Sequence, residues 1–183
     1  MEDMDQKQRD EVSAQPGQLS LVGMGQFYVD FERDEWKHET LCDLFNIINL
    51  TQAIVYCNTA DQATWLAAKL ASNDFSVGVA HGLTDAAYAR AVLADFRTGD
   101  IRVLVVTDGV LLHSVVLTVW LIVNYDLPAN MDDYMLRIGR SGRFARRGVA
   151  INFVTAEAAA QVRQLEEYFN TTIPPLPADL SFM

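Results

Sequence analysis

Apolar residues along this chain alternate between short continuous runs and stretches with helical spacing. The run at 53–57 is apolar throughout, which is typical of a strand covered on both faces. Within 36–49, Leu41, Phe45 and Ile48 recur at the spacing of one helix face. The same patterns predict strands at 27–31, 53–57, 75–80, 102–107, 120–125 and 149–155, and helices at 36–49, 59–70, 84–96, 131–140 and 156–169.

The order of these elements predicts the fold class. Alternating strands and helices indicate an α/β domain with a mainly parallel central sheet and helices on both faces, which makes three layers. We expect a capping box of Thr59 and Gln62 to start the helix at 59–70, and Gly99 to close the helix at 84–96. The prolines at 174–177 exclude another helix there, so this tail is expected to run over the surface.

The first residues differ from the rest. Residues 1–20 are polar, with Pro16 and Gly17 among them, and we expect a flexible leader or interdomain linker. Residues 21–183 are then expected to form one domain, which suits a chain of 183 residues.

Polar or small residues follow four of the predicted strands directly. In open parallel sheets, ligands bind beyond the carboxyl ends of the strands. We therefore take these positions as a candidate binding edge, and the alternative is that they serve only as turn formers and helix caps. They are Asn58 and Thr59, His81 and Gly82, Thr107 and Asp108, and Asp126 in the turn after Tyr125.

Composition narrows the class of protein. No apolar run reaches the ~18 residues that cross a bilayer, and no signal sequence opens the chain, so we expect a soluble protein of the cytoplasm or nucleus with no membrane partner. Cys42 and Cys57 lie in apolar runs and the three histidines are scattered, so we expect buried thiols and no metal site.

Charge is unevenly distributed. The net charge of −10 argues against a nucleic-acid binder, because phosphate contacts need Lys and Arg. However, several basic side chains lie close together in one short segment of the sequence: Arg137, Arg140, Arg143, Arg146 and Arg147. A local cationic strip on an acidic body suits a focused phosphate contact.

The segment 137–148 carries the clearest chemistry. Its arginines recur every three residues with glycines between them. Guanidinium forks match phosphate oxygens, and glycine lets a ligand or a facing domain approach the backbone. The alternative is a solvated basic helix face, which has no need of interleaved glycines.

This segment resembles the HRIGRxGR motif of the DEAD-box RNA helicases. The similarity runs from about Leu19 to nearly the end of the chain and favours members of the initiation factor 4A type and their exon-junction paralogue. It includes the segments 25–29, 35–37, 40–44, 96–99 and 123–128. The chain is identified on this basis as the C-terminal RecA-like half of such a helicase.

The resemblance implies specific roles. Arg140 and Arg143 would be arginine fingers at an ATP site between two RecA-like domains, and Arg137 and Asp126 would couple the domains. Six residues would line the path of the RNA backbone, where phosphates are contacted without reading sequence: Asn58, Thr59, His81, Gly82, Thr107 and Asp108. ATP and Mg²⁺ would be held mainly by the N-terminal domain.

The chain departs from this family in two ways. It contains no GxxxxGK[ST] loop and no Asp-Glu-Ala-Asp segment, so the chain alone is expected to be inactive as an ATPase. Polar residues of the family are also replaced here by Leu83, Ala86, Ala89, Leu136 and the segment 111–115.

Three functional hypotheses remain. The first is half of an ATP-dependent RNA helicase, with single-stranded RNA, the N-terminal RecA-like domain and a helical-repeat scaffold of the initiation factor 4G type as partners. The second is a degenerate pseudo-helicase that binds protein or RNA without turnover. The third, an unrelated nucleotide-binding α/β enzyme, is the least favoured.

Overall fold

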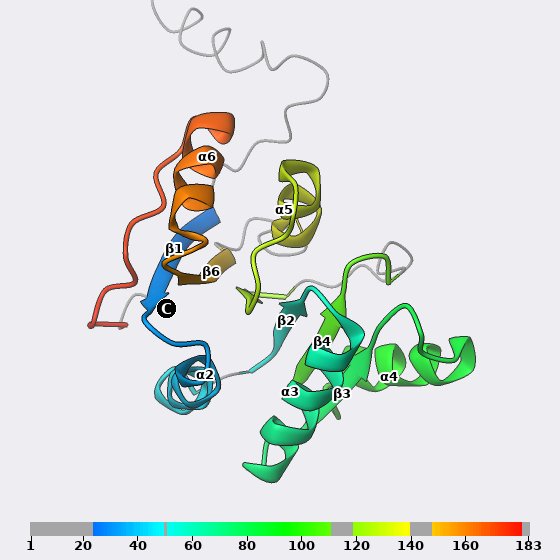
Figure 1. Cartoon of the computed structure of the whole chain (residues 1–183). Helices are drawn as coiled ribbons and strands as arrows, with labels where there is room; N and C mark the ends of the chain where they lie inside the picture. Colours follow the sequence, from blue (N-terminus) through cyan, green and yellow to red (C-terminus); the bar gives the residue numbers. More distant parts are fainter. Residues whose placement is uncertain (1–23, 50, 111–118, 140–147, 181–183) are drawn as a thin grey trace, which may run out of the picture.

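The computed structural model describes residues 24–49, 51–110, 119–139 and 148–180. Within them lie six strands and five helices, coloured along the sequence in Figure 1. The strands are β1 (Met24–Phe31), β2 (Ala53–Cys57), β3 (Val77–Ala80), β4 (Val103–Thr107), β5 (Leu121–Asn124) and β6 (Gly148–Thr155). The helices are α2 (Trp36–Ile47), α3 (Ala60–Ser72), α4 (Ala86–Thr98), α5 (Met131–Ile138) and α6 (Ala159–Phe169).

All six strands form one sheet in the order β1-β6-β5-β2-β4-β3. Every neighbouring pair runs parallel. The predicted α/β class and parallel sheet are therefore confirmed. The carboxyl ends of all strands consequently lie along one edge of the sheet.

Alternate side chains of the strands face two different helix layers. Val55, Val105 and Val123 belong to an apolar cluster with residues of α2 and α3. On the opposite face, Ile54 and Leu104 pack with α4, and β6 packs with α5 and α6. Figure 1 shows α2 well separated from α5 and α6, on the other side of the strands. The three-layer arrangement is thus confirmed, and it buries β2, β4 and β5 along their whole length.

The predicted caps are confirmed, but several boundaries move. Thr59 Oγ1 accepts a hydrogen bond from the backbone N–H of Gln62 at 3.2 Å, and Gly99 ends α4 with a left-handed φ of 91°. The start of α4 is two residues later than predicted. Asp85 caps it by accepting from the N–H groups of Ala87 and Tyr88 at 2.9 and 3.1 Å.

Three other elements are shorter than predicted. The strand expected from residue 75 begins at Val77, and the helix expected from residue 156 begins at Ala159. Helix α5 ends at Ile138, with Gly139 as its C-cap, instead of continuing to residue 140. In each case the central part of the element is where it was predicted.

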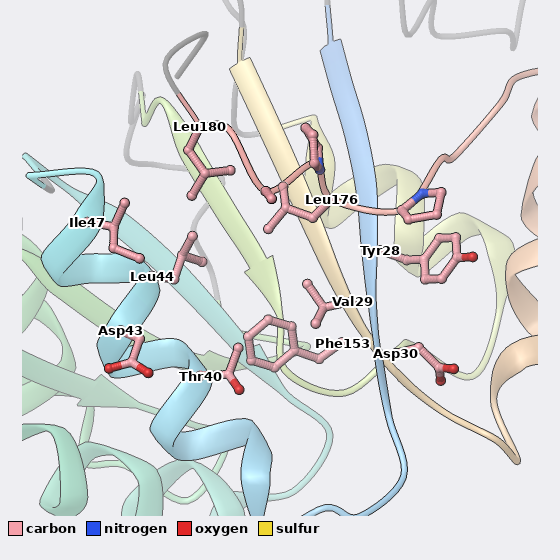
Figure 2. A pocket seen from close by; sticks show the side chains of 13 residues that line it. Tyr28, Val29, Asp30, Thr40, Asp43, Leu44, Ile47, Phe153, Leu176 and Leu180 are labelled. Atoms are coloured by element: carbon pink, nitrogen blue, oxygen red, sulfur yellow. The ribbon is translucent and has the colours of Figure 1, made fainter.

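The proline-containing tail lies against the edge strand β1, as predicted for a surface segment. Tyr28 donates its backbone N–H to the carbonyl of Pro174 at 3.0 Å, and Leu176 donates to the carbonyl of Tyr28 at 2.8 Å. The tail, β1 and α2 enclose a groove of about 440 Å³. Figure 2 shows Leu176 and Leu180 of the tail on one side of the groove and Ile47 of α2 across from them. No helix of the described residues is long and apolar enough to cross a membrane.

Candidate functional site at the strand ends

Parallel pairing brings the predicted binding residues to one edge of the sheet. Cys57 is in register with Thr107, and Tyr56 is in register with Asn124. Asn58, Asp108 and Asp126 follow these strands directly. The sequence prediction that these polar residues gather at one edge is therefore correct for β2, β4 and β5.

Arg137 lies at the centre of this edge. It projects from the last turn of α5 and is 1% exposed. Its Nε donates to Asp108 Oδ1 at 2.8 Å, and its Nη2 donates to the other carboxylate oxygen of Asp108. Nη2 also donates to Asn58 Oδ1 at 2.8 Å. Nη1 donates to the carbonyl of Asp126 at 2.6 Å and to Asn124 Oδ1 at 3.3 Å.

These bonds use all five N–H groups of the guanidinium. The cation also lies over the ring of Tyr56, 5.0 Å from its centroid. A direct hydrogen bond from Arg137 to a second domain would have to replace one of the five. The role of Arg137 in coupling two domains therefore stays a prediction. Its contacts agree best with an indirect role, in which Arg137 positions Asp108 or Asn58.

A second set of contacts holds Asn58 from the other side. Its backbone N–H donates to Asp126 Oδ2 at 3.0 Å, and its side-chain amide donates to the carbonyl of Leu127 at 2.7 Å. The Asp126 carboxylate in turn lies 3.7 Å from Lys37 Nζ, which is 2.8 Å from Asp34. Asp126 and Arg137 thus fix the loop after β2 together.

Sequence reasoning did not assign a role to Lys37 or Asn124. Lys37 is 7% exposed although its side chain is charged, and its ammonium lies 5.5 Å from the centroid of the Tyr125 ring. The signal was present, because Lys37 shares a helix face with Leu41 and Leu44. We call Lys37, Asn58, Asp108, Asn124, Asp126 and Arg137 the central cluster.

Buried acids beside the central cluster are held in their neutral forms. Burial raises the pKa of the Cys57 thiol far above its ordinary value; Asp126 raises it further, while Arg137 and Lys37 lower it. Burial likewise raises the pKa of Tyr125. Cys57 is a buried thiol, as predicted, and its raised pKa keeps it protonated at neutral pH.

The remaining strand end, after β3, is more sparsely bonded. His81 Nε2 lies 3.2 Å from Thr64 Oγ1, and the backbone N–H of His81 donates to Thr84 Oγ1 at 2.9 Å. His81 Nδ1 is buried, with no hydrogen-bond partner among the described residues. Leu83 is 84% exposed and Tyr88 is 53% exposed. We call residues 81–89 the edge region.

The other predicted site residues have mixed outcomes. Thr59 caps α3 and Thr107 is buried at the end of β4, whereas Gly82 is open, with nothing within 4 Å of a Cβ built on it. Arg140, Arg143 and the segment 111–115 lie outside the described residues. Across the part of the chain that the structure describes, no three His, Cys, Asp or Glu side chains are grouped so that they could hold a metal ion.

Comparison with known proteins decides the family. The family described as "Helicase conserved C-terminal domain" matches residues 36–145. Initiation factor 4A of Caenorhabditis elegans is 44% identical over 164 residues, which is 90% of this chain and 41% of that protein. The ATP-dependent RNA helicase eIF4A of Schizosaccharomyces pombe is also 44% identical, over the same share of this chain.

The chain belongs to the helicase C-terminal domain family. The C-terminal domain of the DEAD-box protein Dbp5 has a TM-score of 0.77 and 31% identity, over 85% of this chain and 91% of that chain. Saccharomyces cerevisiae Dbp5 bound to RNA and ADP BeF3 has a TM-score of 0.74 and 27% identity, over 98% of this chain and 50% of that chain. The helicase C-terminal domain described above is thus a RecA-like domain of the DEAD-box type. It spans about two fifths of the length of the curated relatives that it matches.

Proposed function

We propose that this domain is the C-terminal half of an ATP-dependent RNA helicase of the initiation factor 4A type. In this proposal the central cluster holds Asn58 and Asp108 beside the backbone of single-stranded RNA, with Thr59, His81, Gly82 and Thr107 along the same edge. The single observation that carries it is the burial of Arg137 between Asp108, Asn58 and Asp126 at the strand ends, in a domain of this family.

The proposal includes a nucleotide site shared with a second RecA-like domain. Arg140 and Arg143 would reach the phosphates of ATP as arginine fingers, and Mg²⁺ would be held mainly by the other domain. The two arginines follow Arg137 and the end of α5 in the sequence, within the segment that resembles the HRIGRxGR motif. A helical-repeat scaffold of the initiation factor 4G type is the proposed protein partner, and the cytoplasm or nucleus the proposed location.

A second candidate is a pseudo-helicase that binds RNA or protein without turnover. It is favoured by the edge region, where Leu83 is 84% exposed and Ala86 and Ala89 carry no polar group. The edge region therefore has fewer polar groups that could bind a phosphate, or couple RNA binding to the ATP site, than the resemblance to the DEAD-box family implies. This candidate keeps the fold and the central cluster and removes only RNA-stimulated ATP hydrolysis.

RNA-stimulated ATPase activity of the full-length protein that contains this chain separates the two candidates. The helicase proposal predicts that single-stranded RNA raises the rate, and that Arg140→Ala or Arg143→Ala lowers the rate by about 10³-fold. Arg163→Ala, on the exposed side of α6, is the matched control and should leave the rate unchanged. A full-length protein that binds RNA but shows no RNA-stimulated hydrolysis would support the pseudo-helicase.

RNA binding by the present chain tests the shared part of both candidates. Affinity for a single-stranded RNA of mixed sequence should be weak and should fall with salt, with a log–log slope of roughly −2 for a few phosphate contacts. An affinity that is the same at low and high salt would contradict the phosphate contact.

A further inference from the structure

A row of buried polar side chains extends from the central cluster across the sheet. Asn124 of β5, Asn152 of β6 and Tyr134 of α5 are each 0% exposed, and Gln26 of β1 is 5% exposed. Asn124 and Asn152 are direct neighbours in the pairing of β5 with β6. The row therefore joins Arg137 to the edge strand β1, on the face that α5 covers.

Each member of the row is hydrogen-bonded to the next. Arg137 Nη1 donates to Asn124 Oδ1 at 3.3 Å, and Asn124 Nδ2 donates to Asn152 Oδ1 at 2.8 Å. Asn152 Nδ2 donates to the hydroxyl of Tyr134 at 3.1 Å, and that hydroxyl donates to Gln26 Oε1 at 2.9 Å. Asn152 Nδ2 also donates to the carbonyl of Phe27 at 3.0 Å, which anchors the row to the backbone of β1.

All of these bonds point in the same direction. Asn124, Asn152 and the Tyr134 hydroxyl each accept on the side toward Arg137 and donate on the side away from it, and Gln26 accepts at the end of the row. The dipoles of these amide and hydroxyl groups are therefore aligned with the positive guanidinium. Such a row polarises its members cooperatively in a medium of low dielectric constant. Burial raises the pKa of Tyr134 far above its ordinary value, so its hydroxyl keeps the proton that it donates to Gln26.

The row is costly in a core that could be apolar. Residues beside it in β5 and β6, such as Ile122, Ala150 and Val154, are apolar and fully or almost fully buried. Buried amides need every hydrogen bond satisfied, so apolar side chains at these positions would pack the same space without that requirement. What the polar groups supply is a fixed direction for the acceptor that meets Arg137.

We propose that Asn124, Asn152, Tyr134 and Gln26 form a positioning row that sets the orientation of Arg137 and, through it, of Asp108 and Asn58. These four are positioning residues, since none of them lies at the strand-end surface. The inference that the row orients Arg137 is independent of the proposed function, whereas its expected effect on RNA affinity rests on the proposed function.

Two conservative variants interrupt the row at different distances from Arg137. Tyr134→Phe removes only the hydroxyl, and Gln26→Leu removes the last acceptor. Val162→Ala is the matched control, because Val162 belongs to the same apolar cluster as Tyr134 and takes no part in the row. The three variants of the 183-residue chain are compared with the unchanged chain after correction for their unfolding free energies.

Hydrogen exchange of the Arg137 Nε–H, followed by nitrogen-15 NMR, reports the orientation directly. Tyr134→Phe should raise the exchange rate roughly fivefold, the equilibrium factor of one lost hydrogen bond, and Gln26→Leu should raise it less. Val162→Ala should leave the corrected rate unchanged. Affinity for single-stranded RNA should fall in the same order.

A purely structural role predicts another pattern. Tyr134→Phe and Gln26→Leu would then match Val162→Ala in both Arg137 exchange and RNA affinity, and that result would overturn the proposal. If the unchanged chain shows no salt-sensitive RNA binding, the proposed function fails instead. The exchange of the Arg137 Nε–H still decides the positioning row in that case.

Discussion

The central cluster and the edge region lie on the same edge of one sheet but are held in opposite ways. In the central cluster, Arg137, Lys37 and Asn124 are buried, and Arg137 and Lys37 are hydrogen-bonded or ion-paired to the more exposed Asn58, Asp108 and Asp126. In the edge region, the described side chains make few polar contacts, and Leu83 and Tyr88 are mostly exposed. Polar bonds hold the first region and apolar packing of β3 and α4 holds the second, so a substitution should act by a different mechanism in each.

The largest effect is expected from Arg137→Ala. The substitution leaves Asp108, Asn58 and Asn124 without the donor that they share. Breaking a buried ion pair costs about 3–5 kcal/mol, and we expect the lower end, about 3 kcal/mol, because the Asp108 side chain keeps 37% exposure. Urea unfolding followed by circular dichroism measures the loss.

Arg163→Ala controls for the removal of an arginine. Its side chain is exposed on α6, so the unfolding free energy should change by at most about 0.5 kcal/mol. If Arg137→Ala and Arg163→Ala lowered the unfolding free energy equally, the hydrogen bonds of Arg137 would not be a specific source of stability.

The next largest effect should come from overpacking beside the edge region. A Cβ added to Gly78 of β3 would lie 2.6 Å from Val92 Cγ1 and 2.8 Å from Ile101 Cδ1. Gly78→Ala should therefore cost about 2 kcal/mol, as expected for an extra methyl in a packed core. Gly82→Ala adds the same methyl where nothing lies within 4 Å, and should be nearly neutral in the same urea experiment.

Alkaline pH should weaken the domain through the acids buried beside the central cluster. The folded pKa of Cys57 is raised above its ordinary value of 9.0, so its contribution to stability is complete below pH 9 and is lost as pH rises. Between pH 9 and 10 this one thiol should remove about 1 kcal/mol. Unfolding free energies measured across that interval should fall less steeply in Cys57→Ala.

Cys42→Ala is the matched thiol deletion for this experiment. Burial also raises the pKa of Cys42, but this side chain is 9% exposed while Cys57 is 0% exposed. We therefore expect Cys42→Ala to change the pH dependence of the unfolding free energy less than Cys57→Ala does. If the unfolding free energies of Cys57→Ala and Cys42→Ala changed equally with pH, the burial of Cys57 would not account for the loss of stability at alkaline pH.

The sequence predicted the sheet and its binding edge because both depend on local patterns. Continuous apolar runs marked β2, β4 and β5, and polar residues after them marked Asn58 and Asp108. The partners of Arg137 could not be predicted from the sequence alone. They come from three separate strand ends, up to 79 residues away in the case of Asn58, and only the strand order brings them together.

Two other features show the limits of local patterns. No burial was predicted for Lys37, and packing of α2 against Tyr125 places its charged group in the interior beside Asp126. Asn124 and Asn152 stand in strands whose apolar runs conceal them, and their pairing depends on the register of β5 with β6. A single polar residue in an apolar run is a usable signal when its neighbour across the strand pair is polar as well.

The smallest effect is expected from restoring polar groups to the edge region. The double substitution Ala86→Gln and Ala89→Arg places an amide and a guanidinium at the start of α4, close to the end of β3. The resemblance to the DEAD-box family implies polar residues at these two positions. Under the proposed function, single-stranded RNA should bind about threefold more tightly at low salt, and one new phosphate contact should steepen the log–log salt slope by about 0.7. Ala94→Arg adds the same charge more than one turn further along α4, away from the strand ends, and should raise the affinity less without reproducing the change in slope. If both variants behaved alike, the gain would be a general charge effect, and the edge region would not lie on the path of the RNA.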